Sequence, residues 1–230
     1  MSDGRANGST GNGPQNFEQS YIGLRRDLLA LVDRAPTSIL EVGCATGTTG
    51  GHLKDRYGCR VTGIEIDPAM ALVAEQRLDR VIVANLNRAF IDELVGAMRF
   101  DLILLGDVLE HLVDPWNAMV RARRLLAKDG RIITSVPNVI HLSTLASLVF
   151  LRRWPYRDRG IHDRTHLRFF TRKNLLELYA LAGLSVERER RNLRFIDAPA
   201  TLLNLPARLF DFPSFRSYLT YQYLDRLRPA

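Results

Sequence analysis

Cysteine and lysine are scarce in this chain of 230 residues. The two cysteines, Cys44 and Cys59, exclude a disulfide framework and favour a reducing compartment. The lysines are Lys54, Lys128 and Lys173, so nearly all of the 32 basic residues are arginines, and the net charge is +7. Arginine binds phosphates and carboxylates through its planar fork. One interpretation of the arginine excess is an anionic partner. The other is that the source genome favours arginine codons and that these side chains are simply solvated on the surface.

Long hydrophobic runs are also missing. The longest apolar stretch, residues 139–151, is interrupted by polar side chains, so the sequence predicts no membrane-spanning helix. Residues 1–16, MSDGRANGSTGNGPQN, lack the apolar centre of a signal peptide and are rich in Gly, Asn and Ser. We therefore expect a disordered leader over 1–16 and a cytoplasmic protein.

Apolar strand-like runs alternate with helical patterns through most of the chain. The predicted strands are residues 38–42, 60–66, 81–86, 100–108, 131–138, 184–191 and 218–227, and the predicted helices are 17–35, 48–58, 67–79, 117–130 and 171–183. Asp67 and Thr171 are expected as N-caps, and Gly58 and Gly130 as helix ends. This order predicts an α/β fold with a doubly wound parallel sheet. We expect one domain over 17–230, with a lid or insert around 139–170 and a loop insertion around 193–215.

A glycine-containing turn follows the first predicted strand, in the stretch ILEVGCATGTTG at 39–50. The turn lacks the second and third glycines of the dinucleotide motif G-x-G-x-x-G, and it lacks the lysine of a phosphate-binding loop. What remains is the pattern E-x-G-x-x-x-G, formed by Glu41, Gly43 and Gly47. An ordinary strand-to-helix turn is the alternative for this motif taken alone.

This turn, with later positions, resembles class I S-adenosylmethionine-dependent methyltransferases over nearly all of 17–227. The resemblance implies a Rossmann-like sheet of seven strands, mostly parallel with an antiparallel last strand, and helices on both faces. It also implies that Glu65 binds the ribose hydroxyls, that Asn85 replaces an aspartate at the adenine amino group, and that Asp107 lies near the methionine moiety. The implied residues for the cofactor, S-adenosyl-L-methionine, are Glu41, Gly43, Cys44, Ala45, Gly47, Glu65, Ile66, Asn85, Leu86, Gly106 and Asp107. Ala45 stands where glycine is commoner, so we expect a negative φ there.

The segment GIHDRTHLRFFTRKNLLELYALAG, at 160–183, resembles a branch of the family often associated with glycan and polysaccharide biosynthesis. The resemblance implies O-methylation of a sugar or small-metabolite hydroxyl, on a small-molecule or glycan acceptor that is neutral or anionic. An RNA methyltransferase is the rival that the pI of about 9.8 favours, but the segment GDVLEH lacks the Pro-Pro motif that aligns a base amine, so nucleic acid is not expected. A cofactor-binding subunit without activity is the third reading.

The candidate bases are three polar residues near the predicted strand ends. His166 is the first choice to take the acceptor proton, Asp163 is its expected orienting partner, and His111 is the second choice. The alternative for His166 and Asp163 is a purely structural role in the loop, and the alternative for His111 is packing at the start of a helix. A divalent metal held by His162, Asp163 and His166, with added ligands from Asp107, Glu110 and His111, is an alternative for this H-D-x-x-H motif, but no metal is expected.

Two further segments have open interpretations. Arg25 and Tyr21, in the leading helix, are candidates to reach the methionine carboxylate, or they simply pack and face solvent. Residues 139–151 fit a lid, core packing or a lipid-facing helix. A membrane surface is the weakest of the expected partners, and the sequence predicts no oligomeric state.

Overall fold

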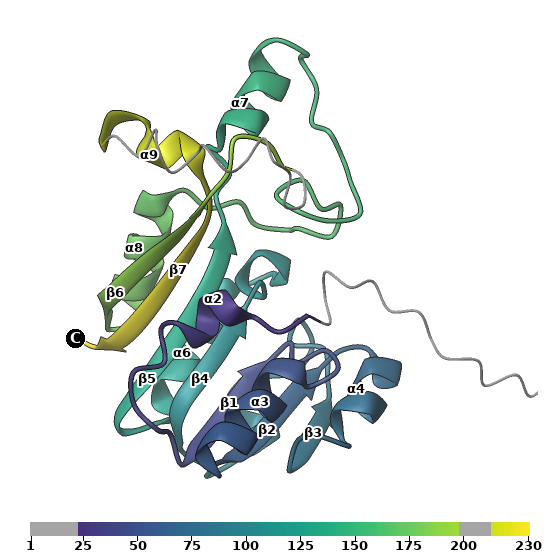
Figure 1. Cartoon of the computed structure of the whole chain (residues 1–230), viewed down its shortest axis with the longest axis vertical. Coiled ribbons are helices and arrows are strands. Elements are labelled where there is room, and N and C mark those ends of the chain that lie inside the picture. Colours follow the sequence, from purple (N-terminus) through teal and green to yellow (C-terminus); the bar gives the residue numbers. More distant parts are fainter. Residues whose placement is uncertain (1–22, 198–212) are drawn as a thin grey trace, which may run out of the picture.

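The computed structural model of the chain describes residues 23–197 and 213–230 (Figure 1). The predicted leader, Tyr21 and most of the predicted loop insertion at 193–215 therefore lie outside the described residues.

A mixed sheet forms the centre of the described molecule, in the order β3-β2-β1-β4-β5-β7-β6. The strands are β1 (Ser38–Val42), β2 (Arg60–Glu65), β3 (Arg80–Val83), β4 (Phe100–Gly106), β5 (Leu126–Pro137), β6 (Leu184–Leu193) and β7 (Thr220–Pro229). The pairs among β1 to β5 are parallel, and β7 runs antiparallel to both β5 and β6. The predicted seven-stranded sheet with an antiparallel last strand is confirmed.

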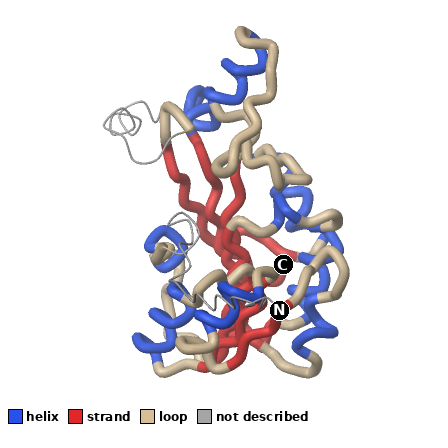
Figure 2. Tube along the Cα trace, turned by 90° about the vertical axis from the view of Figure 1, so that its right-hand side faces the viewer, coloured by secondary structure: helices blue, strands red, loops and turns tan. Residues whose placement is uncertain are grey.

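Helices cover both faces of this sheet, as the edge-on view shows (Figure 2). The helices are α2 (Arg26–Leu29), α3 (Thr48–Tyr57), α4 (Pro68–Ala74), α5 (Ile91–Val95), the 3₁₀ helix η1 (Leu109–His111), α6 (Pro115–Arg124), α7 (Leu142–Val149), α8 (Arg172–Leu181) and α9 (Pro213–Leu219). Three of the four predicted helix ends form: the Asp67 side chain accepts from two amides of α4, Gly58 ends α3 at φ 65°, and Thr171 makes a capping box with Asn174.

Two apolar cores result, one on each face, because successive residues of a strand point in opposite directions. Ile39 of β1 packs on one side with Leu28 and Leu53, which come from α2 and α3. Leu40 packs on the other side with residues of α5, α6 and α8, namely Ile91, Met119 and Leu175. The parallel strands are buried on both faces, which explains their nearly continuous apolar runs.

Several predicted boundaries are wrong, and the packing explains them. In place of a helix over 17–35, the described part of that segment holds only the four residues of α2. The helix predicted to reach Gly130 ends at Arg124, because β5 begins at Leu126, which pairs with Phe100 of β4; the register then shifts before Arg131 pairs with Leu102. The short helix α5 was not predicted, and α4 ends at Ala74 rather than Asp79. Residues 213–219 are helix α9, so they are neither loop nor strand.

None of the helices in the described ranges combines the length and apolarity needed to cross a bilayer. The segment between β5 and α8 leaves the sheet instead: α7 stands at the upper end of the long axis of the molecule (Figure 1). From there the chain returns through residues 152–170 toward the carboxyl ends of the parallel strands, where a large pocket lies.

Candidate active site

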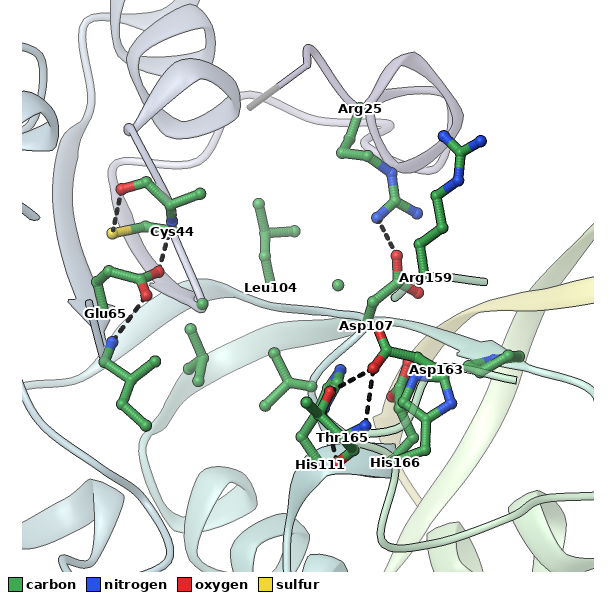
Figure 3. Close-up of a pocket in the computed structure, with 18 of the residues that line it drawn as sticks. Arg25, Cys44, Glu65, Leu104, Asp107, His111, Arg159, Asp163, Thr165 and His166 are labelled. Carbon is green, nitrogen blue, oxygen red and sulfur yellow. Dashed lines mark hydrogen bonds and ion pairs between the residues drawn. The ribbon is translucent and has the colours of Figure 1, made fainter. Parts of the chain in front are cut away.

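A cavity of about 1430 Å³ lies at the carboxyl ends of β1, β2 and β4, where doubly wound sheets bind ligands. The turns after these strands form one wall, and the returning loop, with residues 157–160 and 163–167, forms another. Figure 3 shows the two ends of the cavity, with Cys44 and Glu65 at one end and Asp107, His111 and His166 at the other.

The glycine turn after β1 has a backbone that L-residues rarely adopt. Gly43 has φ +67°, and a Cβ there would lie 3.0 Å from Val108 Cγ2. Ala45 has φ +48°, so the negative φ expected for it is wrong. The turn explains this value, since the Gly47 amide must return to the Cys44 carbonyl at 2.8 Å while the Ala45 amide points to Glu65. Strained backbone of this kind concentrates at ligand sites.

Glu65 closes β2 and holds this turn. Its Oε2 accepts from the Ala45 amide at 2.7 Å, and its Oε1 accepts from the amides of Ile66 and Asp67 at 2.8 and 3.0 Å. The residue is only 6% exposed and lines the cavity, so its carboxylate forms part of the pocket wall. Because a carboxylate has about four acceptor sites, capacity remains on Oε2 for a ligand hydroxyl.

Glu41, at the end of β1, lies under the same turn. Its Oε2 accepts from the Gly50 amide at 2.9 Å, at the start of α3. Burial, opposed by that hydrogen bond, raises the pKa of Glu41 to about 8. A Cβ on Gly50 would lie 2.4 Å from this oxygen, so the glycine is required for the close approach.

Three further predicted residues form the outer wall beyond Glu65: Ile66, Asn85 and Leu86 all line the cavity. The Ile66 side chain is 60% exposed and therefore open to a planar ligand. Asn85 Oδ1 accepts from the Asn87 amide at 2.9 Å, which holds the side chain at the pocket edge.

Asp107, directly after β4, organises the opposite end of the cavity. It has φ +57°. Its carboxylate accepts from Arg25 Nη1 at 2.6 Å, from Ser135 Oγ at 2.7 Å and from the Gln222 amide nitrogen. The negative charges of Asp107 and Asp27 raise the pKa of Arg25 against the opposing effect of burial. Arg25 is thus fixed beside the pocket as a permanent cation.

The two candidate base histidines meet beside Asp107. The rings of His111 and His166 pack edge to face with centroids 4.7 Å apart. His166 Nδ1 lies 3.1 Å from the Ile161 carbonyl, so this backbone oxygen, rather than Asp163, holds that nitrogen. The Asp163 side chain accepts from the amide and hydroxyl of Thr165. Burial, and next the neighbouring His111, lower the pKa of His166.

Glu110 directly precedes His111 in GDVLEH; the sequence suggested it only as an added metal ligand, and not as a cofactor or base residue. Its side chain is buried and lines the cavity, and its Oε2 has no hydrogen-bond donor among the described residues. Burial, and next the charge of Asp107, raise the pKa of Glu110 well above its usual range. A neutral carboxyl at this place can donate a hydrogen bond into the pocket.

The predicted H-D-x-x-H group does not converge as a metal site. His162 lies between Thr144 Oγ1 and Asp197 Oδ2, each 3.0 Å from one ring nitrogen, in the buried base of the loop. His166 instead lies beside Glu110 and His111, and the potential ligand atoms of these three residues all lie within 4.8 Å of one another. This second set of three donors has the composition of a divalent cation site.

Most of the predicted site therefore comes together. Of the predicted cofactor residues, Gly47 alone does not line the cavity; it is the N-cap of α3 at φ +71°. All three predicted base residues line it. The lining also contains polar residues outside the predicted cofactor and base sets, among them Glu110, Thr165, Asn192 and Gln222.

The chain matches a known protein family. Residues 15–189 match the family model of a methyltransferase domain. The chain belongs to this methyltransferase domain family. The resemblance to S-adenosylmethionine-dependent methyltransferases is confirmed, and with it an enzyme of this class that takes S-adenosyl-L-methionine as its cofactor.

Named relatives are more distant. The chain is 28% identical over 172 residues to a ubiquinone biosynthesis O-methyltransferase from Cereibacter sphaeroides, an alignment that covers 73% of this chain and 68% of the relative. It is 27% identical over 198 residues to one from Xanthomonas oryzae pv. oryzae, covering 80% and 81%. Its fold matches the N-methyltransferase NodS from Bradyrhizobium japonicum, solved with S-adenosyl-L-homocysteine, with a TM-score of 0.57, 19% identity, and coverage of 89% and 84%.

Proposed function

We propose that this methyltransferase methylates a hydroxyl oxygen of a small acceptor, with His166 as the base. The hydroxyl oxygen attacks the methyl carbon, the bond from that carbon to the sulfonium breaks, and the hydroxyl proton passes to His166. The observation that carries the proposal is the pairing of His111 with His166 in the same cavity as Asp107. The donor is already activated, so the protein contributes alignment and a proton acceptor.

The charges around His166 support its role as the base. Burial and His111 keep His166 neutral at pH values where a free histidine begins to bind a proton. A neutral imidazole can accept the hydroxyl proton, and the nearby carboxyl groups of Asp107 and Asp163 favour the charged form that results. A catalytic base needs this balance between an available lone pair and a stabilised product.

The polar lining beyond the histidines favours a sugar or another hydroxylated, anionic metabolite as the acceptor. Arg157, Arg159, Arg194, Asn192 and Gln222 line that side of the cavity. Arg152 and Arg153, from the same arginine-rich loop, do not belong to the lining. The proposed anion contact therefore rests on the first three arginines.

A hydroxyl on a quinone precursor is the second candidate, because the relatives are named for ubiquinone biosynthesis. The two acceptors are separated by incubating the protein with methyl-labelled S-adenosylmethionine and either fractionated source glycans and metabolites or a phenolic quinone precursor. Label in an ether of one pool identifies the acceptor, and His166→Ala serves as the inactive control.

Two outcomes would contradict the proposal. Label incorporated into RNA would identify the nucleic-acid alternative. Cofactor binding without turnover on any pool would identify a non-catalytic subunit.

For an anionic acceptor, raising the salt concentration should weaken acceptor binding and spare cofactor binding.

A further inference from the structure

The end of α7 exposes a continuous apolar segment far from both cores. Leu148, Val149, Phe150 and Leu151 are consecutive residues, and their exposed fractions are 44%, 65%, 80% and 62%. Tyr156 follows at 73%. Single exposed apolar residues are ordinary, but a contiguous exposed group of them marks a surface that binds a protein, a membrane or a ligand.

The exposed residues belong to a hydrogen-bonded turn at the end of α7. The Phe150 and Leu151 amides donate to the carbonyls of Ala146 and Ser147 at 3.0 and 3.2 Å, and the Ser147 hydroxyl donates to the Arg153 carbonyl at 2.9 Å. Thr144 is hydrogen-bonded to the buried His162. The helix therefore buries hydroxyl side chains and presents apolar ones, the reverse of a helix that packs on a soluble core.

The stretch of sequence that contains the segment carries charge of one sign. From Gly130 to Arg157 the sequence contains no aspartate or glutamate. Arg152 and Arg153 follow Leu151 directly, and both are exposed. We define residues 148–153 as the α7 tip. Apolar residues with flanking arginines and a nearby tyrosine have the composition of segments that lie in a membrane interface.

We propose that the α7 tip docks this methyltransferase on an anionic lipid bilayer. The apolar side chains enter the boundary between headgroups and acyl chains, and the two arginines bind lipid phosphates. α7 stands at the extreme end of the long axis, so the tip can reach a flat surface without a clash with the sheet (Figure 1).

A second copy of the chain fits the tip less well. A symmetric pair of tips would bring Arg152 and Arg153 against the same arginines of the partner, and like charges oppose such an interface. A stable protein interface also takes about 20–30 residues from each side. The tip, with Tyr156, is much smaller than that.

Docking at the tip would place the cavity near the bilayer surface. The chain from the tip continues directly into residues 157–160, which line the cavity. The Thr144 to His162 hydrogen bond also joins α7 to this loop. An acceptor carried on a lipid, or one concentrated at a membrane surface, would then be close to His111 and His166.

The test is sedimentation of the full chain with vesicles of phosphatidylcholine alone or with about 30% phosphatidylglycerol. The parent should bind the anionic vesicles. Phe150→Ser combined with Leu151→Ser should lower binding at least about tenfold. Arg152→Gln combined with Arg153→Gln should lower binding to anionic vesicles about 20- to 30-fold at low salt and remove the lipid preference.

Matched controls are Leu181→Ser and Arg124→Gln, which change exposed residues on α8 and α6 and should bind like the parent. Cofactor affinity should be unchanged in every variant. Failure of the parent to bind anionic vesicles, or equal binding by the tip variants, would overturn the proposal. A parent dimer in sedimentation velocity that Phe150→Ser dissociates would assign the tip to self-association instead.

Discussion

The rings of His111 and His166 lie edge to face with their centroids 4.7 Å apart, and they join the turn after β4 to the returning loop. After burial, the neighbouring His111 lowers the pKa of His166, because two adjacent imidazolium charges would repel. This pair therefore controls both the position and the protonation of the proposed base.

Replacing His166 with alanine should lower kcat about a hundredfold, the lower range of general-base contributions. Cofactor affinity, measured by calorimetry, should stay at the parental value. The pKa of His166 is lowered, so the parent should lose activity only as the pH falls below this depressed value, further into acid than the usual 6.5. Parental turnover in His166→Ala would transfer the role to His111.

Glu65→Ala should weaken cofactor binding by about 1.5–3 kcal/mol, because a charge-assisted hydrogen bond to the ribose is lost and the Ala45 amide loses its acceptor. Glu75→Ala, an exposed change at the end of α4, is the control for the loss of one negative charge. Undiminished affinity in Glu65→Ala would contradict the assignment of the ribose site.

Gly43→Ala and Gly58→Ala form a matched pair of substitutions at left-handed positions, with φ +67° and +65°. Each should cost about 1–2 kcal/mol of stability in thermal unfolding. An added Cβ meets Val108 at 3.0 Å in the first case and nothing within 4 Å in the second. Cofactor affinity should therefore drop more than about tenfold for Gly43→Ala, by the common cost of overpacking, and remain unchanged for Gly58→Ala.

The stability of the protein should fall as the pH rises from about 4.5 to 8, by the contribution of Glu41. Burial raises the pKa of this group to about 8 in the folded chain, against 4.5 for the free side chain. The folded state therefore binds more protons in this window, and a rising pH favours unfolding. Urea titrations should show a flatter pH dependence for Glu41→Gln. An unchanged slope would show that Glu41 is not the titrating group.

Turnover should survive removal of divalent cations, since His166 is proposed to act as the base without a metal. The measurement is activity after dialysis against a chelator, with and without added Mg²⁺. Loss of activity that Mg²⁺ restores would contradict this expectation and assign the ion to the donor set Glu110, His111 and His166.

Local signals in the sequence predicted the sheet, and the resemblance of its strand-end motifs to a known family implied the cofactor side of the site. Buried parallel strands read as apolar runs, and the turns that follow them carry Glu41, Gly43 and Glu65 within a few residues of each strand end. Asp67, Gly58 and Thr171 mark helix ends by side-chain or backbone chemistry that needs no distant partner.

Only the tertiary structure decided how distant segments meet. Leu126 became the first residue of β5 because Phe100 of β4 offers it a pairing partner, and this pairing outweighed the helical pattern of the segment. The H-D-x-x-H motif was divided by its contacts: His162 turns into the base of the loop, and His166 turns toward His111 and Glu110. The positive φ of Ala45 likewise follows from Glu65, a residue on the next strand. Such outcomes depend on long-range packing, which spacing along the chain does not encode.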